Sequence, residues 1–234
     1  MSLIAKEINV NYGKSKVVTN VSLEIKQGEK VALLGRNGVG KTTLMKGIIG
    51  VLPIDGKGTL SLDDEDLTKK PAHLHNLAGI GYVPQGREII PDLTVKENLE
   101  LGGLGHKEVD MKAQYEKVLN YFPALNPHLC RPGGVLSGGQ QQQLAIARCL
   151  MGAPKILLLD EPTEGIQPNV VFEIAAIINR ISKEMGLSVV VVEQNLKFAR
   201  RIAERFLIMQ KGEIVCSGAM EELTDEVSRK YLSV

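Results

Sequence analysis

Apolar and polar residues alternate in three stretches near the start of the chain, and this period of two predicts β-strands over 4–13, 16–25 and 29–35. Gly-Lys and Gln-Gly pairs between these stretches are turn signals. The last stretch contains KVALLG, which is short, apolar and Gly-terminated, as is typical of a buried parallel strand. A helix over 41–51, a short strand with an acidic turn over 56–67 and a further strand over 79–85 are predicted next.

A helical pattern replaces the strands between about 88 and 150. The stretch 94–104 opens with Thr94 as a helix N-cap, and Glu97 three residues later completes a capping box. Helices are also predicted over 109–122 and 137–152. Beyond them, strands over 154–161, 187–194 and 207–218 alternate with helices over 170–186, 195–206 and 220–232. This order predicts an α/β fold with a parallel-sheet core and a helical lobe inserted near 88–150.

The composition is that of a soluble globular protein, with 44% hydrophobic and 24% charged residues among 234. A net charge of +1, from 28 basic and 27 acidic residues, argues against charge-driven nucleic-acid binding. The chain has no Trp and few aromatic residues, which argues against a stacking platform for single strands. It has no apolar run of about 18 residues and no signal-peptide pattern, so we expect it neither to span a membrane nor to be secreted.

Three cysteines, Cys130, Cys149 and Cys216, are scattered and odd in number. Their spacing is not that of a metal site. We expect buried or incidental thiols in a reducing cytosol.

A glycine-rich stretch, GRNGVGKT at 35–42, matches the P-loop pattern between an apolar strand and a helix. Its glycines let backbone N–H groups face phosphates, Lys41 can reach the outer phosphates, and Thr42 can offer its hydroxyl to Mg²⁺. The alternative is an ordinary Gly-rich turn between a strand and a helix. We predict that the nucleotide contacts are Gly35, Arg36, Asn37, Gly38, Val39, Gly40, Lys41, Thr42 and Thr43.

A second element, ILLLDEP at 156–162, places Asp160 and Glu161 at the carboxyl end of a buried strand. Ligands of open α/β sheets bind at that edge. Asp160 is predicted to help hold Mg²⁺, and Glu161 to orient or deprotonate a water aimed at the γ-phosphate. The alternative is a strand that ends in a solvated acidic turn.

A third element, LSGGQ at 136–140, puts a hydroxyl and two glycines at a helix start. A helix N-terminus attracts anions, but without a lysine this one can supplement a phosphate site rather than make one. The alternative is a Ser-capped helix with a solvated amide face at 141–143.

The P-loop, LSGGQ and LLLDEP, in that order and with a Gln after a strand between the first two, resemble the ABC ATPase family over about residues 3–232. The resemblance implies a P-loop NTPase (RecA-like) core with an N-terminal antiparallel β-subdomain and an inserted helical subdomain. The core would be 1–87 and 151–234, and the helical subdomain about 88–150. It also implies hydrolysis of ATP with Mg²⁺.

Further roles follow from the resemblance alone. Gln85 would lie near Mg²⁺ and the attacking water, and Tyr12 would stack on adenine, although a strand Tyr is more often simply packed. Two chains would meet head to tail around two nucleotides. Each would present its signature residues to the γ-phosphate held by the other chain: Ser137, Gly138, Gly139 and Gln140.

The chain departs from the family pattern in two places. Gln194 stands where the family usually has a histidine, and Gln cannot carry a proton near neutral pH, which puts this subunit's own hydrolysis rate in doubt. In EPTEGIQP, Glu164 and Gln167 replace the usual Ser and Asp of a loop that faces the partner. We therefore favour a heterodimer, with a homodimer open for the isolated chain.

The stretches YVPQGREIIPDLTVKENL, EGIQP and VVEQN, with the short ending YLSV, resemble the ATPases of branched-chain amino acid and urea importers, the urea type most closely. That implies a peripheral subunit on the cytoplasmic face of the inner membrane, bound to permease subunits and served indirectly by a solute-binding protein. A groove near 85–94 would take a short permease helix, with Ile89, Ile90 and Leu93 as contacts or as core residues. No extra C-terminal regulatory domain is expected.

Two other functions stay open at this point. A soluble ABC ATPase of DNA repair or translation usually has a long coiled coil or two fused ATPase units, and this chain shows neither. A P-loop small-molecule kinase would leave LSGGQ unexplained.

Overall fold

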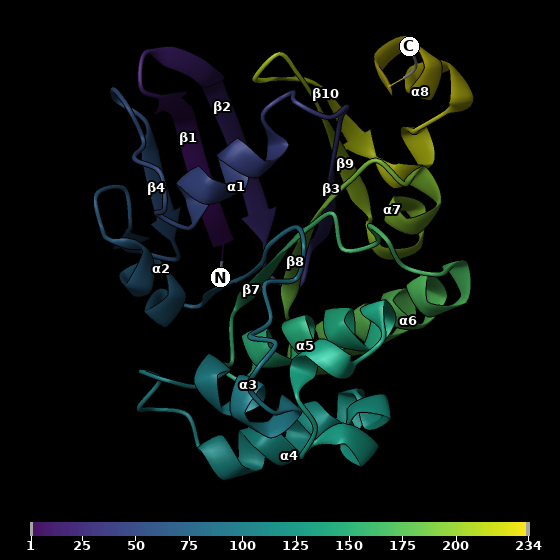
Figure 1. Cartoon of the computed structure of the whole chain (residues 1–234). Coiled ribbons are helices and arrows are strands. Elements are labelled where there is room, and N and C mark those ends of the chain that lie inside the picture. Colours follow the sequence, from purple (N-terminus) through teal and green to yellow (C-terminus); the bar gives the residue numbers. More distant parts are fainter. Residues whose placement is uncertain (1, 233–234) are drawn as a thin grey trace.

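Two β-sheets lie side by side, with a group of helices at one end, in the computed structural model, which describes residues 2–232 (Figure 1). The smaller sheet is antiparallel and has the order β2-β1-β4-β5. Its strands are β1 (Ser2–Tyr12), β2 (Ser15–Lys26), β4 (Thr59–Leu62) and β5 (Glu65–Asp66).

The larger sheet has the order β10-β9-β3-β8-β7-β6, and only β10 is antiparallel to its neighbour. Its strands are β3 (Lys30–Leu34), β6 (Ile80–Val83), β7 (Ile156–Asp160), β8 (Ser188–Glu193), β9 (Arg205–Gln210) and β10 (Glu213–Ala219). Strands β7 and β8 are buried along their whole length, because helices or the other sheet cover both faces.

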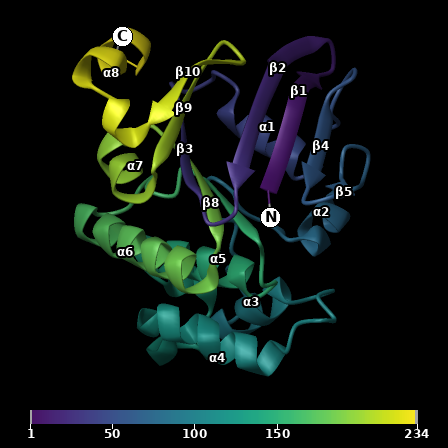
Figure 2. The same cartoon turned by 180° about the vertical axis from the view of Figure 1, so that it is seen from behind.

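Eight α-helices occur within residues 2–232. They are α1 (Lys41–Ile48), α2 (Ala72–Ala78), α3 (Val95–Gly102), α4 (Met111–Tyr121), α5 (Gly138–Leu150), α6 (Pro168–Met185), α7 (Leu196–Ile202) and α8 (Asp225–Leu232). Figure 2 shows α3, α4 and α5 together at the lower end of the molecule, with α6 beside α5. None of the described helices is both long enough and apolar enough to cross a bilayer.

The core is divided by the larger sheet. On one face, Val31 and Leu33 of β3 pack with α1 and the smaller sheet. On the other face, Ala32 and Leu34 pack with α5, α6 and α7. Alternate side chains of β3 thus pack against the layers on both faces of the sheet. This packing fixes the position of the loop that follows β3.

The sequence predicted this fold class correctly: an α/β P-loop core, an N-terminal antiparallel sheet and inserted helices. Several elements differ. The helix predicted over 41–51 ends at Ile48, and the one over 220–232 is a 3-10 turn followed by α8. Helix α2 was not predicted, because His75 is its one buried residue and it has no apolar stripe. Within the inserted segment predicted over about 88–150, the first helix begins at Val95, and Arg87 and Glu88 before it have positive φ.

The amides of α5 correct another expectation. A solvated face was the alternative considered for 141–143, yet Gln142 and Gln143 are buried. Within residues 2–232, Nε2 of Gln142 and Oε1 of Gln143 have no hydrogen-bond partner. The helix therefore carries unmet polar groups on its packed side.

The cysteines are more varied than predicted. Cys130 is exposed, which leaves the incidental alternative for it, while Cys149 and Cys216 are partly buried. Burial raises the pKa of Cys149 to about 12, which keeps this thiol protonated and unreactive near neutral pH.

The start of α3 has the capping box that the sequence predicted. Oγ1 of Thr94 accepts from the Glu97 N–H at 3.1 Å, and Oε2 of Glu97 accepts from the Thr94 N–H at 2.8 Å. The Thr94 hydroxyl also donates to Oε2 of Glu97 at 2.6 Å, and this bond, with the one from the Thr94 N–H, holds the pKa of Glu97 below its usual value. Two donors that would otherwise lack partners at the helix start are satisfied.

Replacement of this cap should lower stability. We expect Thr94→Ala to reduce the free energy of unfolding by about 1 kcal/mol, measured by urea denaturation, because the Glu97 N–H loses its acceptor. Thr94→Ser keeps the hydroxyl and should retain most of that stability. Equal losses in the two variants would contradict a capping role.

Candidate nucleotide-binding site

The loop between β3 and α1 presents backbone rather than side chains to its surroundings. Gly38 and Gly40 have φ of 79° and 107°, a region that side chains disfavour. A Cβ on Gly40 would lie 3.0 Å from the carbonyl oxygen of Val17. Gly40 is also the N-cap of α1 and offers no side-chain cap. The first N–H groups of α1 are thus left for an anion.

Lys41 is 4% exposed and turns back into its own loop. Its Nζ donates to the carbonyl oxygens of Gly35 at 2.8 Å and Arg36 at 3.0 Å, and lies 3.5 Å from Oε1 of Glu161. The ammonium is therefore positioned inside the loop, next to one carboxylate.

A cavity of about 280 Å³ opens beside this loop. It brings together the P-loop, Gln85 and Glu161, which lie far apart in the sequence. Its lining is Val17, Asn37, Gly38, Gly40, Lys41, Thr42, Thr43, Gln85 and Glu161. The shape and the N–H groups suit a polyphosphate.

Asp160 lies at the end of β7, next to the P-loop, and is 1% exposed. Its Oδ2 accepts from the Tyr82 hydroxyl at 3.1 Å, whereas its Oδ1 has no partner among the described residues. Burial raises the pKa of Asp160, and the hydroxyl groups of Thr42 and Tyr82 partly oppose that rise. A buried carboxylate oxygen with a free lone pair, next to a Thr hydroxyl, fits a hard cation such as Mg²⁺.

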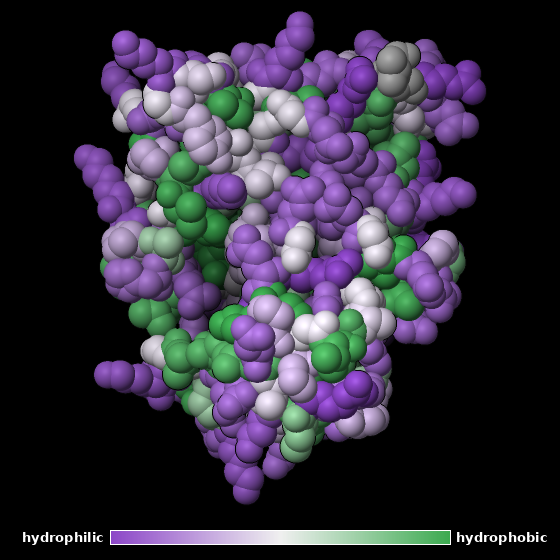
Figure 3. Space-filling model, viewed as in Figure 1, coloured by the Kyte–Doolittle hydropathy of each residue, from purple (hydrophilic) through white to green (hydrophobic). Residues whose placement is uncertain are grey.

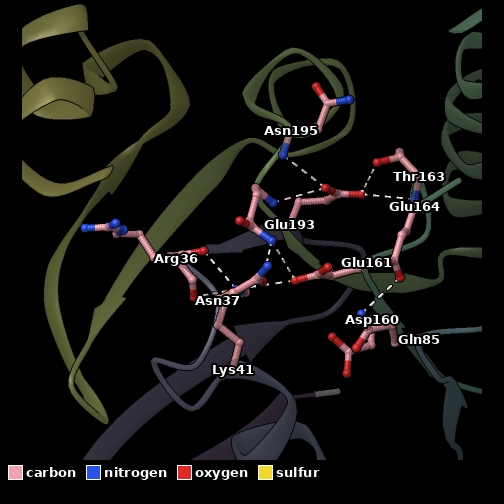
Figure 4. Close-up of polar contacts among 12 residues, drawn as sticks. Arg36, Asn37, Lys41, Gln85, Asp160, Glu161, Thr163, Glu164, Glu193 and Asn195 are labelled. Carbon is pink, nitrogen blue, oxygen red and sulfur yellow. Dashed lines mark hydrogen bonds and ion pairs between the residues drawn. The ribbon is translucent and has the colours of Figure 1, made fainter. Parts of the chain in front are cut away.

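Gln194 contacts both Glu161 and Asn37, which lie close together at the loop (Figure 4). Nε2 of Gln194 donates to Oε1 of Glu161 at 3.1 Å and to Oδ1 of Asn37 at 2.5 Å. Glu161 has φ of 46°, a conformation held partly by its N–H bond to the Val192 carbonyl oxygen at 2.9 Å. Two of the three predicted catalytic residues, Glu161 and Gln194, are thus in direct contact, and Gln85 is the third.

The loop after β6 is tied to the loop after β7. Nε2 of Gln85 donates to Oε2 of Glu164 at 3.0 Å, and Arg87 donates to the Glu164 carbonyl oxygen at 3.2 Å. Arg87 also donates to Oε1 of Gln141 on α5 at 3.2 Å. Three segments therefore share one set of polar contacts.

The predicted signature residues lie outside this cavity. Ser137 caps α5 in a second capping box: its Oγ accepts from the Gln140 N–H at 3.4 Å, and Oε1 of Gln140 accepts from the Ser137 N–H at 3.0 Å. Tyr12, at the end of β1, is also outside the lining and is 47% exposed. Arg36 lines a neighbouring cavity, beside α8. Within one chain, the signature residues do not complete the site.

Sequence reasoning missed three residues here. Val17 lines the cavity from β2, Tyr82 holds Asp160, and Glu193 bonds two loops. Tyr82 and Val17 lie in ordinary strand patterns that carry no chemical signal. Glu193 had a signal, since an acidic residue ends an apolar strand next to Gln194.

A family model described as "ABC transporter" matches residues 18–164. The chain belongs to the ABC transporter family. It is therefore an ATP-binding protein and an ATPase, and the small-molecule kinase alternative is excluded.

Known relatives match nearly the whole chain. It is 40% identical to the high-affinity branched-chain amino acid transport ATP-binding protein BraG of Pseudomonas aeruginosa, over 97% of both chains. It is 36% identical to the lipopolysaccharide export ATP-binding protein LptB of Haemophilus influenzae, over 98% of this chain and 96% of the relative. A solved ATP-binding cassette, dimeric and bound to ADP and phosphate, is 28% identical with a TM-score of 0.82, covering 93% and 98% of the two chains.

Loss of the buried ammonium should weaken nucleotide binding. We expect Lys41→Ala to raise the Kd for a fluorescent ATP analogue at least about tenfold, because a charge-assisted contact to phosphate is lost. Lys46→Ala, in the last turn of the same helix, is the matched control and should bind normally. Unchanged binding by the Lys41 variant would rule out its predicted role.

Proposed function

We propose that this chain is the ATP-hydrolysing subunit of an importer for a small polar solute, bound to permease subunits on the cytoplasmic face of the inner membrane. Residues 1–87 and 151–234 would form the nucleotide-binding core, and about 88–150 the helical subdomain. The observation that carries the proposal is one cavity in which the P-loop, Gln85 and Glu161 converge beside the buried Asp160. The likeness to BraG supports import.

Different residues would bind the phosphates, hold Mg²⁺ and orient the attacking water. P-loop N–H groups and Lys41 hold the phosphates of ATP. Thr42, Gln85 and Asp160 are the residues that would hold Mg²⁺, which when bound neutralises phosphate charge. Glu161 accepts a hydrogen bond from the attacking water and orients it.

Gln194 takes the place of a proton-carrying residue in this proposal. It already donates to Glu161, so its amide can hold that carboxylate in place, and it can donate to a phosphate oxygen. Because an amide does not titrate near neutral pH, Gln194 would position groups without transferring protons.

A second ATPase subunit would complete each site. The predicted signature residues lie at the N-terminus of α5, outside their own chain's cavity, and the solved relative is a dimer: Ser137, Gly138, Gly139 and Gln140. These residues would contact the γ-phosphate held by the partner. We favour a non-identical partner because the chain departs from the family pattern at three positions: Glu164, Gln167 and Gln194.

A groove beside the helices, lined by both apolar and polar residues, would give the permease a docking place. Ile90, Leu101 and Leu104 line a cavity of about 340 Å³ between α2, α3, α5 and the end of β6, and Leu104 is 68% exposed. Figure 3 shows hydrophobic residues gathered between the upper sheets and the lower helices. Of the contacts expected from the sequence, Ile90 lines the groove, Ile89 packs against the core, and Leu93 is outside the lining. The exposed side chains of Ile90, Leu101 and Leu104 suit contact with a helix of a membrane subunit.

Arg87 gives the groove a connection to the site. It lines the groove, and its guanidinium bonds to Glu164 and to Gln141 at the start of α5. A helix that displaces Arg87 would therefore disturb both the loop after β7 and the signature helix. This is a physical route by which permease motion and hydrolysis would be coupled.

Two solute classes are supported by different observations. The 40% identity to BraG favours branched-chain amino acids. The combination of LSGGQQQQLAIAR with EPTEGIQP favours urea or short amides through its resemblance to the urea type. An export role, by likeness to LptB, and a soluble role in repair or translation are the outcomes that would contradict import.

Disruption of the groove should separate hydrolysis from transport. We expect Leu104→Glu to abolish copurification with the permease subunits while basal ATPase activity stays within about twofold, because the groove lies apart from the nucleotide cavity. Val51→Glu, at an exposed apolar residue outside the groove lining, is the control and should assemble normally. Retained assembly of the Leu104 variant would remove the groove from the proposal.

The solute can be assigned with the assembled transporter. ATPase activity in proteoliposomes should rise when the solute-binding protein carries its solute, and leucine and urea are the two solutes to compare. Stimulation by either one supports import and selects the class. Copurification with ribosomes or DNA instead of membrane subunits would overturn the proposal.

A further inference from the structure

Glu193 is a buried carboxylate at the point where β8 ends. It is 3% exposed and lies between the loop that follows β7 and the loop that follows β8 (Figure 4). An ionised carboxylate in such a place is costly unless donors surround it.

Its two oxygens serve two different loops. Oε1 accepts from the Thr163 N–H at 3.2 Å and from the Thr163 hydroxyl at 2.7 Å. Oε2 accepts from the N–H groups of Gln194 and Asn195, both at 3.1 Å. One side chain therefore receives four hydrogen bonds, two from each loop.

Those loops carry the groups proposed to act on the water and the γ-phosphate. Glu161 is two residues before Thr163, and Gln194 directly follows Glu193. The Gln194 amide reaches Glu161 at 3.1 Å, so the contact between the two depends on how the loops sit. We infer that Glu193 is a positioning residue for ATP hydrolysis, which fixes Glu161 and Gln194 relative to each other by bonding both loops at once.

The four hydrogen-bond donors around Glu193 explain why this position needs a carboxylate. All four partners are N–H or O–H groups, and an ionised carboxylate is the side chain that accepts from all of them. A Gln at this position would point its NH₂ group at the two donors of one loop. That loop would then lose both of its hydrogen bonds to the side chain. Burial raises the pKa of Glu193, and the bonds from Thr163, Asn195 and Gln194 oppose the rise. The ionised form is thus kept at a cost in stability, which is common for a residue retained for function.

The inference rests on the proposed roles of Glu161 and Gln194, so its test must measure these separately. The test uses the full chain, with its partner subunit where one is required, and measures kcat, KM for ATP and thermal unfolding. We expect Glu193→Gln to lower kcat about 10- to 100-fold with KM changed less than about threefold, since the P-loop is untouched.

Two matched variants separate positioning from folding. Glu29→Gln makes the same change at a carboxylate that bonds Arg205 and the Lys26 N–H, at the amino end of β3, and kcat should stay near that of the parent whatever happens to the melting temperature. Thr163→Val should lower kcat by part of the Glu193→Gln effect, because one of the two Thr163 bonds remains, and Thr163→Ser should restore it.

A double-variant cycle tests the route of the effect. If Glu193 acts through Gln194, adding Glu193→Gln to Gln194→Ala should lower kcat by clearly less than it does in the parent protein. The inference would be overturned if the fold-loss of kcat in the double variant equals the product of the losses in the two single variants. It would also be overturned if Glu193→Gln keeps a kcat within twofold of the parent. Full activity in Glu161→Gln would instead show that the proposed role of Glu161 is wrong, whatever the Glu193 variant does.

Discussion

Three carboxylates and one ammonium are packed at the carboxyl edge of the parallel strands, and the structure around them is arranged to satisfy these charges. Lys41 faces Glu161, four donors surround Glu193, and Asp160 keeps one oxygen without a partner among the described residues. Acidic groups outnumber the basic one, so this edge favours a cation. The parallel sheet brings them together because all its carboxyl ends open on the same side.

Much of this arrangement could be predicted from sequence. Apolar runs that end in Gly35 or in Asp160 and Glu161 predict parallel strands, and the P-loop spacing places a phosphate site between them. Thr94 and Glu97 reveal a helix start because capping is a local interaction. Such features depend on neighbours within a few residues.

The features that the sequence did not predict depend on contacts between residues far apart in the chain. Local sequence patterns carry no information about such contacts. Gln142 and Gln143 looked like surface residues because polarity predicts exposure, yet tertiary packing buries them. Helix α2 follows a proline and has one buried residue, so it gives no periodic signal. The hydroxyl of Tyr82 reaches Asp160 across 78 residues of sequence, a partnership that neither strand shows alone.

The resting position of Lys41 has a consequence for turnover. Its ammonium is bonded to the carbonyl oxygens of Gly35 and Arg36, so a phosphate bound as proposed would replace these contacts instead of meeting an ammonium without partners. Net affinity is then the difference between two sets of bonds and is smaller than the count of phosphate contacts suggests. If Lys41 binds phosphate as proposed, the reverse exchange would favour release of ADP, because the loop would regain its own bonds. A moderate net affinity of this kind would favour repeated cycles of ATP binding and ADP release.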